Sequence, residues 1–185
     1  MSFPRTLRRA LAPAIALLLT ACSPHYNWRE IHGEGVPYVV ALPARPATFT
    51  RNIDLNGIRV NMTMTAAEVD ATTFAVGTAE LPSAPQAQAA LEKMKEALVR
   101  NIGGTVREQK ILTIALSPGA GGGHLAVLDI TASGRGDAAT GGRPRMLFAR
   151  FLAKDQRVFQ LVATGPEQEL PRDLADTFFS SFKLD

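Results

Sequence analysis

The residues of this chain that could carry covalent or metal chemistry are few and scattered. It has one cysteine, Cys22, and three histidines: His25 and His32 near the N-terminus and His124 after a glycine cluster. This histidine spacing does not match the ligand patterns of zinc sites, so we expect neither a metal ion nor a cofactor. The serines lack the Gly-x-Ser-x-Gly turn that presents a nucleophile. No motif therefore predicts a catalytic residue.

Cys22 stands at the end of a segment with the layout of a secretory signal. Three arginines among the first nine residues form a basic start, and an apolar run follows from Ala10 to Leu19. A helix that spans a bilayer needs about 20 apolar residues, and this run is shorter and interrupted by Pro13. We expect residues 1–21 to be a signal peptide that is cleaved between Ala21 and Cys22.

The tetrapeptide Leu19-Thr20-Ala21-Cys22 resembles the lipobox of bacterial lipoproteins. That resemblance implies that Cys22 is acylated, with palmitate among the chains, and becomes the first mature residue. Several acyl chains hold a protein stably on a membrane, because each buried CH₂ contributes about 0.8 kcal/mol. In the sorting scheme of these lipoproteins an Asp after the cysteine retains the protein in the inner membrane. Ser23 therefore implies an outer-membrane anchor on the periplasmic face. The alternative is an ordinary signal peptide in which Cys22 is incidental.

The charge balance changes once the signal is removed. Three of the 20 Lys and Arg residues precede Cys22, which leaves 17 of them against 17 Asp and Glu. The pI of about 9.4 belongs mainly to the precursor, so a nucleic-acid partner is not expected. The expected partners are the membrane, through the lipid anchor, and a protein of the cell envelope.

Residues 22–36 are predicted to form a lipidated tether ahead of a single domain over residues 37–185. The segment carries Gly, Pro and mixed charges without apolar periodicity, which is typical of a linker. Within it, Tyr26, Trp28 and Arg29 place two aromatic rings beside a cation. These side chains are candidates for contact with a partner or with lipid headgroups. The alternative is that Trp28 packs on the domain and closes an edge.

Runs of alternating apolar and polar residues predict eight strands. They cover residues 38–42, 48–55, 58–66, 72–81, 105–116, 124–132, 144–153 and 157–164. Asn56-Gly57 between the second and third runs predicts a tight hairpin, because both residues tolerate the positive φ of a type I′ turn. In the third run Ile58, Val60, Met62 and Met64 share one face, which we expect to be buried.

Two helices are predicted, and the first is well delimited. Ser83 and Gln86 form a capping box, and Gly103-Gly104 follows the last apolar position. Apolar residues at spacings of three and four form a stripe that should face the sheet: Ala87, Leu91, Met94, Leu98 and Ile102. A second helix is predicted over residues 169–179.

This order of elements predicts an α+β domain, an antiparallel β-sheet with packed helices. The strand end Leu42-Pro43, the central amphipathic helix, Gly165-Pro166 after a late hairpin and the ending Phe178–Phe182 resemble PsbP-like domains. The resemblance runs from about Tyr38 to the C-terminus and implies an α/β/α sandwich. Members of that family are mostly assembly or binding proteins without catalysis. The whole chain also resembles small proteobacterial lipoproteins of unknown function.

Asp129 and Arg150 each interrupt an apolar strand run. If their strands are adjacent, the two side chains can pair across the ladder. We therefore interpret them as a structural pair in preference to a ligand site.

The function expected from these features is that of a non-catalytic binding or assembly module, anchored in the outer membrane, and not of an enzyme. The alternative is a periplasmic hydrolase whose site is assembled from residues distant in sequence. A pocket with two or more convergent ionisable groups would favour the hydrolase, and a shallow apolar patch would favour the module.

Overall fold

The computed structural model describes residues 25–135 and 142–184. The lipobox tetrapeptide with Cys22, the cleavage site after Ala21 and the sorting residue Ser23 lie outside the described residues. Along the described chain the elements are β1 (Arg29–His32), β2 (Tyr38–Leu42), β3 (Ala47–Leu55), β4 (Ile58–Val69), β5 (Thr72–Glu80), α1 (Ala84–Asn101), β6 (Gly104–Ala115), β7 (His124–Gly134), β8 (Arg145–Lys154), β9 (Arg157–Pro166), α2 (Arg172–Ser181) and β10 (Lys183–Leu184).

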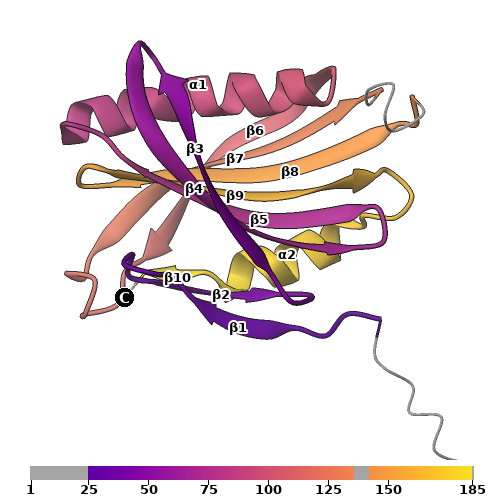
Figure 1. Ribbon diagram of the computed structural model, residues 1–185, viewed down its shortest axis with the longest axis horizontal. Coiled ribbons are helices and arrows are strands. Elements are labelled where there is room, and N and C mark those ends of the chain that lie inside the picture. Colours follow the sequence, from indigo (N-terminus) through magenta and orange to yellow (C-terminus); the bar gives the residue numbers. More distant parts are fainter. Residues whose placement is uncertain (1–24, 136–141, 185) are drawn as a thin grey trace, which may run out of the picture.

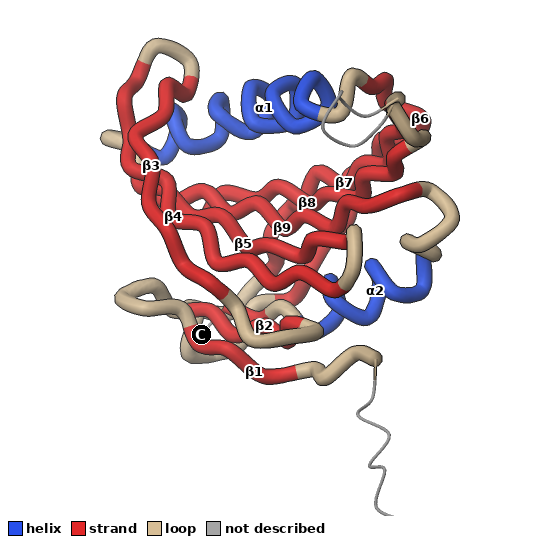
Figure 2. The backbone as a smooth tube through the Cα atoms, turned by 45° about the vertical axis from the view of Figure 1, so that its right-hand side comes forward, coloured by secondary structure: helices blue, strands red, loops and turns tan. Residues whose placement is uncertain are grey.

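The strands form two antiparallel sheets. A seven-stranded sheet has the order β3-β4-β5-β9-β8-β7-β6, and a small sheet has the order β1-β2-β10. Helix α1 crosses one face of the large sheet, while α2 and the small sheet lie on the opposite face (Figure 1; Figure 2). This outer layer is part helix and part strand, so the α/β/α description understates the strand content of the fold.

Helix α1 begins and ends where its sequence signals predict. The Ser83 hydroxyl accepts a hydrogen bond from the Gln86 backbone N–H at 3.4 Å and donates one to the Gln86 side chain at 2.9 Å. Gly103 follows the helix with a φ of 56°, a left-handed conformation that glycine adopts readily. The predicted stripe faces the sheet, with Leu91 and Met94 buried.

The β3–β4 hairpin also follows its sequence signals. Asn56 and Gly57 have φ values of 58° and 83°, as a type I′ turn requires. Val60 and Met62 are buried on the α1 side of β4. The opposite face of this hairpin carries hydroxyl and amide side chains.

Each face of the large sheet buries its own apolar core. Leu91, Met94 and the β8 residue Phe151 belong to the core under α1. The core on the other face contains Phe74 and Phe178, whose rings pack edge to face with centroids 5.6 Å apart. These cores account for most of the apolar burial and hold the two outer layers against the sheet.

Three features differ from the sequence prediction. The segment expected to be a tether contains β1, which pairs with β2 from Arg29↔Leu42 to His32↔Val39, so the small sheet includes residues on both sides of the expected boundary at 36. The first predicted strand, β2, belongs to this small sheet and not to the large one. Helix α2 starts at Arg172 and not at residue 169, because Pro171 disfavours helical geometry in the residue before it.

Candidate functional site: a polar groove between the two sheets

A groove separates the small sheet from the outer strands of the large sheet. Its cavity of about 540 Å³ lies between the loop that joins β1 to β2 and the side chains of β4 and β5. We call it the polar groove and define it by the following lining residues: Glu34, Tyr38, Asn61, Thr63, Thr65, Thr78, Glu80 and Arg157.

Strand register places the hydroxyl groups of the groove side by side. Thr63 of β4 lies opposite Thr50 of β3 on one side and Thr78 of β5 on the other. Its hydroxyl lies 2.9 Å from that of Thr50, and the next pair along the hairpin, Thr48 and Thr65, has hydroxyl oxygens 3.1 Å apart. Residues two apart in a strand point to the same face, so these threonines form a small grid of hydroxyl groups.

The wall of the groove is a tight loop between β1 and β2. The Gly33 N–H donates to the Tyr38 carbonyl at 2.9 Å, and the Tyr38 N–H donates to the Val36 carbonyl at 2.8 Å. A Cβ on Gly33 would lie 2.3 Å from the Tyr38 ring, so only glycine fits there. Burial raises the pKa of the Tyr38 phenol, a hydrogen bond with Thr65 opposes that shift, and the Glu34 carboxylate adds to it.

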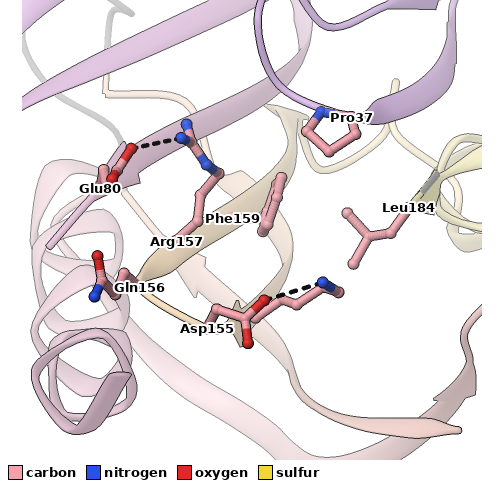
Figure 3. Close-up of a pocket in the computed structure, with 8 residues that line it drawn as sticks. Pro37, Glu80, Asp155, Gln156, Arg157, Phe159 and Leu184 are labelled. Carbon is pink, nitrogen blue, oxygen red and sulfur yellow. Dashed lines mark hydrogen bonds and ion pairs between the residues drawn. The ribbon is translucent and has the colours of Figure 1, made fainter. Parts of the chain in front are cut away.

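An ion pair forms one end of the polar groove. Arg157 at the start of β9 lies opposite Glu80 at the end of β5, and its guanidinium donates to the carboxylate at 2.6 Å. Beyond this pair is a smaller pocket of about 310 Å³. Figure 3 shows Phe159, Pro37 and Leu184 to one side of the Glu80–Arg157 pair, with a second ion pair, Lys154–Asp155, below them. We call this the apolar pocket after its three apolar lining residues, Pro37, Phe159 and Leu184; its other five lining residues are polar or charged.

The structure brings Asp129 and Arg150 together on β7 and β8. They lie opposite each other in the ladder, and the Arg150 Nε donates to the Asp129 carboxylate at 2.7 Å. Lys110 of β6 and Arg172 of α2 also reach this carboxylate, at 3.8 Å and 3.6 Å. The Arg150 guanidinium carbon lies 4.6 Å from the centroid of the Phe179 ring. The cluster therefore connects three strands to α2, and its geometry is that of a structural site.

The candidate residues Tyr26 and Trp28 lie against the domain. The Trp28 ring packs edge to face on Phe74 with centroids 5.8 Å apart, and Tyr26 stacks on Trp28 at 6.3 Å. Both rings are half-buried, whereas Arg29 is exposed on β1. Burial raises the pKa of the Tyr26 phenol, and the Asp70 carboxylate adds to that shift. This arrangement matches the alternative in which Trp28 packs on the domain. Of the three candidate residues Tyr26, Trp28 and Arg29, Arg29 has the exposed side chain.

Within the described ranges 25–135 and 142–184, no three or more His, Cys, Asp and Glu side chains are grouped so that they could hold a metal ion. The same part of the chain has no helix that is both long and apolar enough to cross a membrane.

Comparisons with known proteins support the fold and do not extend to a family. No protein-family model matches the chain, and no curated protein sequence matches it. The solution structure of cyanobacterial PsbP (CyanoP) from Synechocystis sp. PCC 6803 superposes with a TM-score of 0.50 at 10% identity, over 89% of this chain and 96% of that one. PA94 from Pseudomonas aeruginosa, a protein of unknown function, superposes with a TM-score of 0.39 at 12% identity, over 80% and 90% of the two chains. The similarity to CyanoP shows that the domain has a PsbP-like fold.

Proposed function

We propose that this protein is a lipoprotein, acylated at Cys22 and anchored in the outer membrane on its periplasmic face, whose domain binds an envelope component without catalysis. The polar groove is its binding site. The observation that carries this proposal is the set of hydroxyl groups that β4 and β5 hold in one cavity. Side chains on paired strands are positioned more precisely than side chains on loops.

Preorganisation of the groove favours binding. The Thr50–Thr63 and Thr48–Thr65 contacts fix the rotamers of these side chains before any ligand arrives. The Glu80–Arg157 ion pair fixes the end of the groove in the same way. A ligand that enters therefore loses less free energy to the ordering of side chains than it would at a mobile surface.

The length of the chain before β1 supports a groove that faces away from the membrane. Only Ser23 and Pro24 separate Cys22 from His25, so even a fully extended chain holds the anchor within about 11 Å of His25. Strand β1 then leads away from this end of the small sheet to the loop that walls the groove (Figure 1). The groove thus opens at the far end of β1 from the anchor.

Photo-cross-linking in intact cells tests the binding site. A benzoylphenylalanine residue replaces Glu34 at the groove or, as a control, Gln88 on the exposed face of α1. We expect a discrete adduct on irradiation from the position of Glu34 and none from that of Gln88. Equal labelling at both positions, or none at Glu34, contradicts a binding site in the groove.

The anchor has a separate test. A Cys22→Ala variant should fail to take up labelled palmitate, and a Ser23→Asp variant should move from the outer-membrane to the inner-membrane fraction of a density gradient. Labelling that persists in Cys22→Ala rejects the lipoprotein assignment. Unchanged fractionation of Ser23→Asp rejects the sorting assignment alone.

A hydrolase is the second candidate, and one observation favours it. The side chains of His32, Glu34, Tyr38, Glu80 and Arg157 bring five ionisable groups to one cavity. The Glu80 carboxylate is already held by Arg157, which suits a structural ion pair better than proton transfer. A hydrolase would cleave the bound ligand and release a product, and the Glu34→Gln variant would no longer do so. A binding module would leave the ligand intact in both proteins.

A further inference from the structure

The hydrogen-bonding capacity of the polar groove restricts the chemistry of its ligand. Each threonine hydroxyl has one donor and two acceptor positions, and a Thr–Thr pair uses only one of each. The Thr50–Thr63 pair therefore keeps both an O–H donor and free lone pairs, whereas Thr48–Thr65 keeps free lone pairs and shares a further hydrogen bond with Tyr38. Asn61, whose side-chain oxygen accepts from Asn52 at 3.2 Å, keeps its own N–H₂ donors. A matching ligand offers donors and acceptors in alternation.

The charges of the groove exclude acidic ligands. Its lining carries two carboxylates, Glu34 and Glu80, and one guanidinium, Arg157. That guanidinium is already bound to Glu80. The lining also includes the imidazole of His32, which lies 3.4 Å from the Glu30 carboxylate. A carboxylate or phosphate ligand would therefore meet the free carboxylate of Glu34 without an unpaired cation to bind it. The groove favours a neutral ligand.

Strand pairing argues against an extended peptide on the floor of the groove, which β4 and β5 form. Such peptides bind by adding a strand to an unpaired sheet edge. The groove lies over β4 and β5, and both edges of each strand are already paired: β4 with β3 and β5, and β5 with β4 and β9. Only side-chain groups are therefore available to a ligand from these two strands.

We infer that the polar groove binds a neutral saccharide, an inference that rests on the binding function proposed above. Sugar hydroxyls are donors and acceptors at once and complement Asn61, Thr63 and Thr78. A volume of about 540 Å³ lies within the usual range for small-molecule sites. The apolar pocket, beyond the Glu80–Arg157 pair, presents the exposed ring of Pro37 to the C–H face of an adjoining sugar ring, while Phe159 and Leu184 are buried and contribute little surface. The ligand class is thus a short neutral oligosaccharide.

Calorimetric titration of the acylated protein tests the ligand class. The protein is kept in zwitterionic micelles, because the head groups of glucoside and maltoside detergents would compete for the groove. The probes are tri-N-acetylchitotriose, maltotriose and cellotriose, with trigalacturonic acid as an acidic counterpart and trialanine as a peptide. We expect at least one neutral trisaccharide to bind at micromolar to millimolar concentration, and neither trigalacturonic acid nor trialanine to bind.

Hydroxyl deletions locate the site. The Thr63→Val, Thr78→Val double variant keeps side-chain shape but removes two hydroxyls, and affinity should fall about tenfold or more. Thr113→Val makes the same change at an exposed position of β6 and should leave affinity unchanged. Asn61→Ala alters an exposed side chain, so it supplies a second test if the double variant does not fold.

Three outcomes overturn the inference: no neutral probe binds, the acidic or peptide probe binds instead, or saccharide binding survives all groove variants. Cross-linking at Glu34 without saccharide binding rejects the ligand class but leaves the groove as a binding site. The absence of both rejects the proposed function as well.

Discussion

The two faces of the seven-stranded sheet are covered in different ways. On one face a single 18-residue helix, α1, presents an apolar stripe to the strands. On the other face α2 shares the cover with the three-stranded sheet, and the polar groove remains between that small sheet and the strands. Each cover leaves an opening: a cavity of about 570 Å³ lies between α1 and the β3–β4 hairpin, and the polar groove of about 540 Å³ lies on the opposite face.

Buried polar groups follow the same division. The described part of the chain buries five polar or charged residues, and four of them, Thr65, Thr72, Thr78 and Asp129, lie on the face that α2 and the small sheet cover. Gln160 is the one on the α1 face, where its side chain donates to the Met64 sulfur at 3.3 Å. Most of the buried polar side chains in the described part of the chain therefore lie on the face that carries the polar groove, where the proposed recognition would use them.

The largest effect should come from Asp129→Ala. This change leaves the guanidinium of Arg150 without its partner in a site where the Asp129 side chain is only 3% exposed. Loss of one partner of a buried ion pair typically costs about 3 to 5 kcal/mol of unfolding free energy. Urea denaturation measures this loss. The double change Asp129→Leu, Arg150→Met removes both charges and should lower the free energy of unfolding far less. An equal loss would show that the interaction between the two charges does not explain the effect of Asp129→Ala.

On the α1 face, Met94→Ala should lower stability without affecting recognition. Met94 is fully buried between α1 and the sheet, and Met-to-Ala changes in cores cost about 2 to 5 kcal/mol. Urea denaturation and cross-linking at Glu34 are measured on the same variant. Unchanged cross-linking supports the division between the two faces, and its loss in a folded variant contradicts that division.

Trp28→Ala should have a smaller effect on stability. The ring is half-buried against Phe74, so its loss should cost about 1 to 2 kcal/mol, below the value for a fully buried large side chain. Thermal unfolding measures this cost. If the melting temperature stays unchanged while the set of cross-linked partners changes, Trp28 is a contact residue and not a packing residue.

The smallest effect should appear only in alkaline solution. The pKa of Tyr38 is raised in the folded protein, chiefly by burial, so its neutral form contributes stability that is complete below about pH 10 and is lost as the pH rises through the folded value. Tyr38→Phe removes this contribution. The melting temperature of the wild type should therefore fall more than that of the variant as the pH rises above about 10. Parallel curves would show that Tyr38 does not titrate in this way.

Local signals predicted the α1 face well. The Ser83 cap, the glycine after the helix and the Asn56-Gly57 turn each depend on neighbours in sequence, and the structure confirms all three. The sequence also indicated that Asp129 and Arg150 could pair if their strands were adjacent, and β7 and β8 place them opposite each other. The approach of Lys110 and Arg172 to Asp129 had no such signal, since it depends on the bulge in β6 and on the position of α2.

The groove could not be predicted because it depends on tertiary placement. Strand β1 has little apolar alternation, since its residues are mostly exposed, so its pairing with β2 left no pattern in the sequence. Without knowledge of that pairing, the sequence pattern of β2 predicts one more strand of the large sheet. The only local signal was the pair of Thr-x-Thr runs at Thr48–Thr50 and Thr63–Thr65, and their meeting across a hairpin does not by itself indicate a cavity.

Hydrogen exchange measured by mass spectrometry, with and without the neutral trisaccharide that binds most tightly, tests most directly the claim that recognition belongs to one face. Slower exchange is expected in peptides that cover the loop from Gly33 to Tyr38, because ligand contact stabilises the Gly33 N–H bond to the Tyr38 carbonyl. Peptides from α1 should exchange at unchanged rates. Protection confined to α1, or equal protection of both faces, would contradict the account.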